Sequence, residues 1–417
     1  MNIFQKSVRP VINQSLVIGG AKFIALSMPF VDIIMLSKMA FDKNALSDYI
    51  FSTQIIQIFV VLSLSLSIGI PIFYNKINDK KHALQISISY AYLLGIVLFL
   101  LSILLFLCLD NYLKFTDSQY LTYLCLAIGI LPLPAYIIFS HILDTMGKSN
   151  YTFGVTLIFA VLNIILNAIF VLFINNYDQV AVSLSTTIIR FLGFLIFFIL
   201  ICREFKIKYF LPKMDKKYFM EICSFGASEA ISSLIFVISF AALTYYITFN
   251  FSSEIIEQYG ILLNFINTIF VIYIGLSISI SIHLSKISGI NNIKWNNFII
   301  LYCIAVGVIV FLTIPFFSWL YFGNFDFTNI YLMIPALLVA VFDGISVAII
   351  SKLRVLGFKK YPPLFRLLFA FIGVPFGVIC LHYFQIFGLF AAFALINLMI
   401  LFLIFYFDKK MIHDCGA

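Results

Sequence analysis

The stretch REFKIKYFLPKMDKK, from Arg203 to Lys217, is the longest basic interruption in an otherwise apolar chain and lies close to the middle of its 417 residues. Hydrophobic residues make up 63% of the chain and charged residues only 11%. A water-soluble globule needs more polar surface than this composition supplies, so the chain must use lipid as its solvent. The basic stretch therefore divides a membrane protein into two halves.

Apolar segments of membrane-spanning length recur on both sides of this stretch. A helix needs about 20 apolar residues to cross a bilayer core. Alternating segments of strand length are absent from the sequence, which excludes a transmembrane barrel. Twelve segments are predicted, at residues 15–37, 47–73, 84–109, 119–143, 152–174, 179–202, 219–249, 255–285, 296–322, 327–351, 362–384 and 387–407.

The predicted fold class is an all-α integral membrane protein with twelve transmembrane helices, six in each half. Because six is even, both halves enter the membrane in the same direction, which favours two parallel repeats with lobes at 1–210 and 211–417. Parallel repeats recur in transporters, with the substrate site at the interface between halves. Adding 210 to a residue number often gives a similar residue, as for Tyr49 and Tyr259, Gln54 and Asn264, Gln57 and Asn267, Lys76 and Lys286, and Gly147 and Gly357.

The basic residues predict the orientation. In the twelve-helix arrangement, twenty Lys and Arg residues fall in breaks on one side and only Lys38, Lys43 and Lys114 on the other. The positive-inside rule then places both termini in the cytoplasm. This pattern accounts for the net charge of +8 without nucleic acid as a partner. No cleavage site follows the first apolar run, so we expect it to remain as a signal anchor.

One carboxylate stands out in the first segment, in MPFVDIIMLSKM from Met28 to Met39. Asp32 lies in a run that is otherwise apolar, and a charge at mid-bilayer costs about 2.5 to 3.5 kcal/mol. Small residues share its helical face, which indicates packing against protein. The alternative is an interfacial acid, because Lys38 follows only six residues later, about 9 Å along a helix.

Polar residues in two further segments could accompany Asp32. Asn163 and Asn167 are four apart and project from one helical face. Thr186 and Arg190 lie on one stripe of the next segment. With a carboxylate, these oxygens could hold a partly dehydrated cation or position a proton acceptor. The alternative is that they only link helices by hydrogen bonds.

The second half carries its own intramembrane acid, Asp343, nine residues before Lys352. Amides and tyrosines matched across the halves could line a substrate cavity, although sequence does not separate that role from links between helices. The five histidines are scattered, and neither a nucleophile elbow nor a phosphate loop is present, so an enzyme is not expected. The seven cysteines show no metal spacing and predict neither a metal site nor disulfides. The cavity candidates are Gln54, Gln57, Tyr245, Asn264, Asn267 and Arg190.

These stretches together resemble the multidrug and toxic compound extrusion (MATE) family of cation-coupled antiporters. The similarity rests on PFVDIIMLSKM, on ILDTMGKSNYTF followed by NIILN, and on DGISVAIISKLRVLGFKKYPPLFRLLFAFIGVPFGV from Asp343 to Val378. The last stretch is similar to the family pattern of an acid, an arginine-x-x-glycine loop and a proline-glycine region.

The resemblance implies a cation site in the amino-terminal lobe at Asp32, Asn163, Asn167 and Thr186, with possible Na⁺ binding, and a carboxy-terminal acid at Asp343. The chain departs from the family at Phe236, which aligns with an acid of some members. Position 167 is aspartate in some relatives and asparagine here, so Na⁺ is not favoured over H⁺.

We therefore expect an antiporter of the cell inner (plasma) membrane that exports an organic, amphipathic or cationic solute in exchange for H⁺ or Na⁺, by alternating access. Its partners would be the small solute and the lipid bilayer, and we expect a monomer without a further cofactor. One alternative is a flippase for lipid-linked oligosaccharides, although only Lys22, Arg190 and Arg366 lie within apolar runs to meet a pyrophosphate. A membrane scaffold is the other, and it would not need intramembrane carboxylates.

Overall fold

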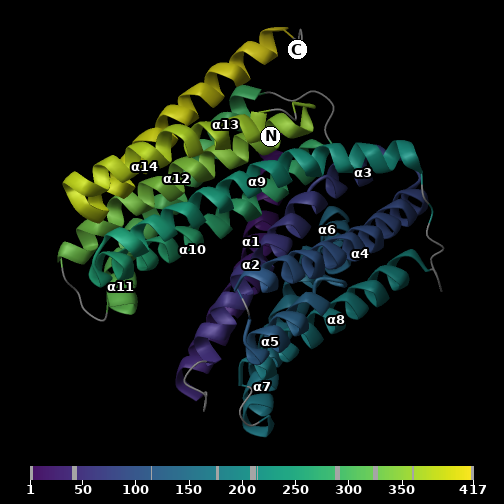
Figure 1. Cartoon of the computed structure of the whole chain (residues 1–417). Helices are drawn as coiled ribbons and strands as arrows, with labels where there is room; N and C mark the ends of the chain where they lie inside the picture. Colours follow the sequence, from purple (N-terminus) through teal and green to yellow (C-terminus); the bar gives the residue numbers. More distant parts are fainter. Residues whose placement is uncertain are drawn as a thin grey trace. The chain divides into compact units, whose positions relative to one another are not determined.

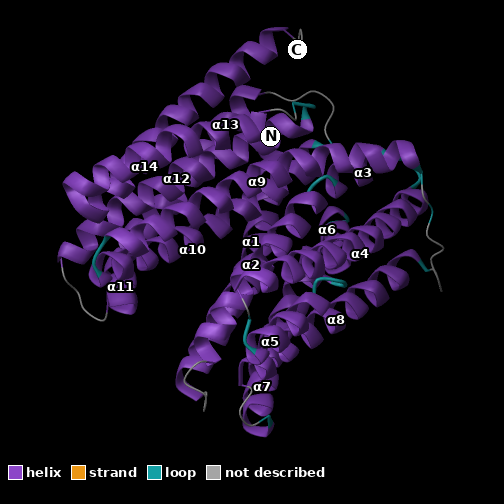
Figure 2. Ribbon diagram, viewed as in Figure 1, coloured by secondary structure: helices purple, strands orange, loops and turns teal. Residues whose placement is uncertain are grey.

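The computed structural model of the chain describes residues 3–39, 45–113, 115–174, 178–206, 213, 215–286, 292–322, 327–358 and 361–414. Figure 2 shows helices joined by loops, and these ranges contain no strand. The boundary predicted between residues 210 and 211 lies outside the described residues. The helices (Figure 1) are α1 (Ile3–Met39), α2 (Ala45–Ser67), α3 (Ile70–Lys76), α4 (Lys80–Leu113), α5 (Asp117–Ile128), α6 (Leu133–Thr145), α7 (Ser149–Phe173), α8 (Asp178–Phe205), α9 (Lys216–Asn250), α10 (Ser253–Leu284), α11 (Asn292–Phe322), α12 (Phe327–Val355), α13 (Tyr361–Leu368), the π-helical turn η1 (Phe369–Gly373) and α14 (Val374–Asp414).

The chain divides into two compact units. The amino-terminal unit is Gly20–Ala230, and the carboxy-terminal unit is Ile231–Ala417 together with Met1–Gly19. Each has its own apolar core, built in the first around Tyr90, Leu126 and Phe139 and in the second around Tyr273, Ile299 and Phe390. The lobes predicted at 1–210 and 211–417 remain a prediction about the repeat.

Helices cover each of the twelve predicted segments. Two segments are broken where proline removes a backbone donor: Pro71 lies in the first turn of α3, and Pro132 and Pro134 lie where α6 begins. By length and composition, ten helical spans of the described residues are long and apolar enough to cross a membrane. The last of them, Tyr361–Lys409, contains two of the predicted segments.

This span, which comprises α13, η1 and most of α14, holds both segments because α14 turns back on itself. The backbone leaves helical values at Phe384 (φ −127°, ψ 15°) and Gln385 (φ 53°, ψ −149°). After this turn, Gly388 lies directly against the backbone of Cys380, and Gly377 packs against the ring of Phe393. The glycines allow two antiparallel helices to lie close together with almost no connecting loop.

Lipid-facing surface is clearest on α4. The exposed face of this helix carries large apolar side chains along most of its length, which is the surface that a membrane helix offers to acyl chains. The residues are Leu93, Ile96, Val97, Leu100, Leu101, Leu104 and Leu107.

Two turns that lie 210 residues apart, the spacing of the predicted repeat, have similar backbone conformations. Gly147 (φ 78°) and Gly357 (φ 99°) each follow the end of a helix in the left-handed conformation, and they are 210 residues apart. In both turns the amide of the residue after the glycine donates to the carbonyl of the residue five positions before that amide, as in a Schellman cap. The two bonds are Lys148 to Leu143, 2.9 Å, and Phe358 to Leu353, 3.1 Å.

Replacing either glycine by alanine is expected to destabilise the protein. A Cβ in the left-handed conformation costs about 1 kcal/mol, so Gly147→Ala and Gly357→Ala should each lower the midpoint of thermal unfolding of the purified protein. Gly154→Ala in α7 is the control, since a Cβ there meets no atom within 4 Å and the backbone is helical. It should leave the midpoint unchanged or raise it, and a similar loss at all three positions would contradict this assignment.

Candidate cation-coupling site

The Asp32 carboxylate lies inside the amino-terminal unit, on α1, with an exposed fraction of 0%. It accepts hydrogen bonds from three other helices. Two amides donate to its Oδ1: Asn163 Nδ2 at 2.9 Å and Asn167 Nδ2 at 2.6 Å. Two hydroxyls donate to its Oδ2: Tyr49 Oη at 2.7 Å and Thr186 Oγ1 at 3.2 Å. Four neutral donors therefore surround one buried charge.

The sequence of α7 explains why both asparagines reach Asp32. Its buried stripe is mostly polar, whereas Leu157, Ile158, Val161, Ile165 and Leu172 are exposed on other faces. Residues three or four apart share a helix face, so the polar groups lie in one line. The buried stripe comprises Ser149, Thr152, Thr156, Phe159, Asn163, Asn167 and Val171.

Further residues hold the asparagines and supply positive charge. Ser185 Oγ donates to Asn163 Oδ1 at 3.0 Å, which orients that amide with its nitrogen toward Asp32. Arg190 interacts electrostatically with Asp32 and Tyr49. Its guanidinium lies beside Gly129, where a Cβ would come within 3.1 Å of Arg190 Nη1. Arg190 is thus a neighbour of Asp32 within this unit.

The residues present fit a small cation or a proton. Asn167 Oδ1 is buried and has no hydrogen-bond partner within the described part of the chain. Together with the Asp32 and Thr186 oxygens it provides the hard donors that a cation such as Na⁺ accepts. A proton on Asp32 would turn one carboxylate oxygen into a hydrogen-bond donor, so one neighbouring donor would have to become an acceptor. The hydroxyls of Tyr49 and Thr186 can make this change by rotating.

The interfacial alternative for Asp32 does not match this geometry. The carboxylate is enclosed by neutral groups from α2, α7 and α8 and is not exposed. The side chain of Lys38 lies outside the described residues. Links between helices and cation coupling both remain compatible with the four hydrogen bonds, so the coupling role stays a prediction.

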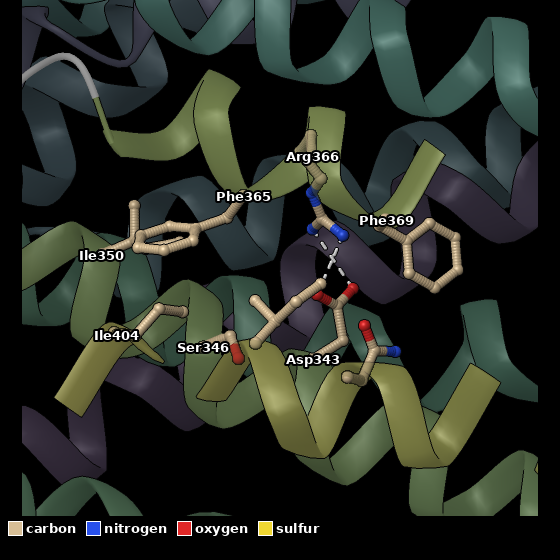
Figure 3. A pocket seen from close by; sticks show the side chains of 9 residues that line it. Asp343, Ser346, Ile350, Phe365, Arg366, Phe369 and Ile404 are labelled. Atoms are coloured by element: carbon tan, nitrogen blue, oxygen red, sulfur yellow. Dashed lines mark hydrogen bonds and ion pairs between the residues drawn. The ribbon is translucent and has the colours of Figure 1, made fainter. Parts of the chain in front are cut away.

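Asp343 has a different environment in the carboxy-terminal unit. Figure 3 shows the Arg366 side chain, from α13, pointing directly at the Asp343 carboxylate on α12. Arg366 Nη1 lies 2.9 Å from Asp343 Oδ1, and Nη2 lies 3.2 Å from Oδ2. The guanidinium carbon also lies 4.9 Å from the centre of the Phe236 ring. The predicted acid is therefore neutralised by a residue of the same chain.

Five of the six predicted cavity residues are exposed polar side chains, which apolar helices rarely carry, and the sixth, Arg190, is only partly exposed. Gln54 and Gln57 are the exposed side chains of α2 in the described residues, and Asn264 and Asn267, with Glu254, are those of α10. Tyr245 on α9 is 67% exposed. The contact of these residues with solute stays a prediction.

Sequence reasoning missed two members of the Asp32 cluster, Tyr49 and Ser185. The sequence marks Tyr49 only as the predicted repeat partner of Tyr259, and a tyrosine in an apolar run looks like a core aromatic. Its spacing offered a signal, because a buried phenol needs a partner and Asp32 is the acid of the preceding segment. Ser185 lies next to Thr186, and no spacing rule distinguishes it from neighbouring hydroxyls.

Comparison with known proteins adds the family to this geometry. Residues 18–169 match the MatE family model. The chain is similar to the outward-facing structure of a multidrug resistance MATE family transporter of the MOP superfamily, at 14% identity with a TM-score of 0.83, over 99% of this chain and 97% of that one. It is similar to a MATE structure in the straight conformation, at 14% identity with a TM-score of 0.79, over 98% and 96%.

A third similar structure is a MOP superfamily transporter from Pyrococcus furiosus, at 13% identity with a TM-score of 0.82, over 99% of this chain and 97% of that one. For that protein, a reverse polarity of the binding pocket suggests a different function. Comparison with curated protein sequences gives no match.

These matches confirm the resemblance to MATE transporters and the predicted all-α, twelve-helix fold. The molecule is a multi-pass membrane protein with the fold of a MOP superfamily transporter, and MATE proteins are not enzymes. Within that class its amino-terminal part, residues 18–169, carries the MatE signature.

Tyr49→Phe should destabilise the protein through Asp32. A hydrogen bond to a charged acceptor contributes about 1.5 to 3 kcal/mol, against about 1 kcal/mol for a neutral pair. The matched control is Tyr259→Phe, because Tyr259 is also buried and shares a hydrogen bond of 3.2 Å with the neutral Thr244 hydroxyl. Thermal unfolding should show the larger loss for Tyr49→Phe, and this excess should disappear in an Asp32→Asn background. Equal losses in both backgrounds would sink the assignment.

Proposed function

We propose that the protein is a cation-coupled antiporter that exports an organic, amphipathic or cationic solute across the cell inner (plasma) membrane in exchange for H⁺ or Na⁺. Asp32, Asn163, Asn167 and Thr186 carry the coupling ion. The observation that supports this most is the Asp32 carboxylate, buried and bonded to four neutral groups. An ionised carboxylate in the membrane interior costs free energy. Because the four donors are neutral, they stabilise the carboxylate without cancelling its negative charge, which a mobile cation can then balance.

Coupling follows from differential affinity. The cation binds Asp32 in one conformation of the transporter, and the solute binds better to another. Each ligand therefore shifts the population toward the conformation that it binds. The cluster joins α1, α2, α7 and α8, and a cation that replaces hydrogen-bond donors around Asp32 changes how these helices are held together. Asp343 is not included among the coupling residues because Arg366 pairs with it. Its assignment to ion coupling stays a prediction from the family resemblance.

The exposed amides support an aqueous path for the solute. On α4 the exposed face is apolar, as lipid contact requires. On α2 the exposed side chains of the described residues are Gln54 and Gln57, and the equivalent positions of α10 are Asn264 and Asn267. Amides facing acyl chains would lose their hydrogen bonds, so we assign both faces to water-filled space that the solute crosses, and with them Tyr245.

A lipid-linked oligosaccharide flippase is the second candidate, and one observation weighs against it. Such a flippase needs free positive charge for a pyrophosphate group. Of the three basic residues within the apolar runs, Arg366 forms an ion pair with Asp343 at 2.9 Å, so its charge is neutralised by that carboxylate. Only two others, Lys22 and Arg190, lie within these runs.

Asp32→Asn should abolish ion-driven export while leaving the protein folded and inserted. The measurement is solute export in everted vesicles, driven in turn by a pH gradient and by a sodium gradient, which also identifies the ion. Asp48→Asn is the matched control, since Asp48 is a buried acid of α2 that accepts a hydrogen bond from Gln119 at 2.9 Å and lies outside the cluster. Full export by the Asp32 variant would falsify the assignment.

Cysteines at the exposed amides should react with a membrane-impermeant maleimide. The experiment places Gln54→Cys or Asn264→Cys in a variant whose seven native cysteines are serine. Thiolate, the reactive form, requires water, so both positions should be labelled, and excess solute should slow the reaction. Leu100→Cys, on the lipid-facing surface of α4, is the control and should stay unlabelled. Equal labelling of all three positions would remove the support for an aqueous path.

A further inference from the structure

The Asp343 carboxylate is already bound to a cation, and that cation is part of the chain. Both carboxylate oxygens are engaged by the two terminal nitrogens of Arg366, at 2.9 and 3.2 Å. This two-bond arrangement between planar groups is the strongest that arginine makes with an acid. Asp343 lies on the membrane-length helix Ile330–Val355, where a partner for the charge lowers its cost.

The second contact of the guanidinium is aromatic. Phe236 of α9 presents its ring 4.9 Å from the guanidinium carbon, and Phe240 lies 4.5 Å from Phe236, ring centre to ring centre. A planar cation over an aromatic face is attracted by the ring quadrupole. A carboxylate on one side and an aromatic ring on the other is the chemistry by which a protein binds a guanidinium ion, and here Arg366 occupies that position itself.

Little space remains beside the pair. The adjoining cavity has a volume of about 10 Å³, at the lower limit of what a single water molecule needs. Figure 3 shows Ser346 and Phe369 around it, with Arg366 reaching across to Asp343. A second cation at Asp343 would therefore have to displace the guanidinium rather than bind beside it.

The element that carries Arg366 is short and leads into irregular helix. α13 has eight residues, and the π-helical turn η1 follows it directly. Such turns are rare, and they frequently lie at functional sites. The arginine is thus placed at a specialised position of the helix rather than in a regular, lipid-facing stretch.

We propose that Arg366 is the resident cation of Asp343: its guanidinium fills the cation position of the carboxy-terminal unit and keeps free coupling ions out of it. Arg366 is then a specificity-determining residue. Removing its charge converts Asp343 and the face of Phe236 into a site for Na⁺ or for free guanidinium. This assigns Asp343 a role other than ion coupling. This proposal rests on the proposed function only in one respect, that Asp32 is the residue that carries the coupling ion. The test below measures cation binding and does not measure transport.

The test uses purified full-length protein in an Asp32→Asn background, which removes the ion response of the amino-terminal site. The midpoint of thermal unfolding is followed with 0 to about 50 mM NaCl or guanidinium chloride, at constant ionic strength set with N-methylglucamine chloride. A ligand that binds only the folded state raises this midpoint. The variants are Asp32→Asn alone and with Arg366→Met, Arg366→Lys, Asp343→Asn, or Arg366→Met plus Asp343→Asn.

Arg366→Met should lower the midpoint, and Na⁺ or guanidinium should restore about 2–4 °C of it in a saturable way. The response should vanish when Asp343→Asn is added. Arg366→Lys, which keeps a resident charge, should not respond to Na⁺. The absence of any cation response in Arg366→Met, or a response that persists without Asp343, overturns the proposal.

A second comparison decides the matter if Arg366→Met does not fold. Asp32→Asn alone and Asp32→Asn with Asp343→Asn should show the same response to Na⁺, because Arg366 excludes the ion. A stabilisation by Na⁺ that is lost with Asp343→Asn would show that Asp343 binds free ions beside Arg366, and the proposal would be wrong. Failure of ion-driven export in the vesicle experiment leaves these binding results unaffected, so the two proposals fail separately.

Discussion

A carboxylate inside a bilayer has to be stabilised from within the protein, and this constraint organises both units. At Asp32 the stabilisation comes from two amides and two hydroxyls. At Asp343 it comes from one guanidinium. The difference matters because neutral donors stabilise the charge without cancelling it, whereas a guanidinium cancels it. A buried acid of the first kind still attracts a cation, and an acid of the second kind already has one.

The predicted repeat would supply a similar backbone twice, while individual positions carry different chemistry. Gly147 and Gly357 end equivalent helices with the same left-handed turn, and Tyr49 and Tyr259 are both buried. The residue 210 positions after Asp32 is Ala242, so the carboxy-terminal half has no acid at the equivalent place. Its acid instead lies on α12 with an arginine partner. The two units thus differ in the surroundings of their buried acids: Asp32 is bonded to neutral donors, and Asp343 is paired with an arginine.

The fold and part of the site could be predicted from the sequence, because both depend on local patterns. Segment length and apolar composition predicted the helices, and the four-residue spacing of Asn163 and Asn167 predicted one shared face. Tyr49 and Ser185 could not be assigned, since their partners depend on how separate helices align. The pairing of Arg366 with Asp343 over Phe236 depends on side-chain direction at three helices, and sequence spacing does not contain it. The turn at Phe384 and Gln385 was predicted only as a short gap between two segments.

That turn has a consequence for how the chain is made. The two arms of α14 are joined at Phe384 and Gln385, and glycines at 377 and 388 bring the arms into contact. Because only these two residues join the arms, little chain can lie between them on that side of the bilayer. The position of each arm in the membrane therefore depends on the other, and the two are expected to insert together as a helical hairpin.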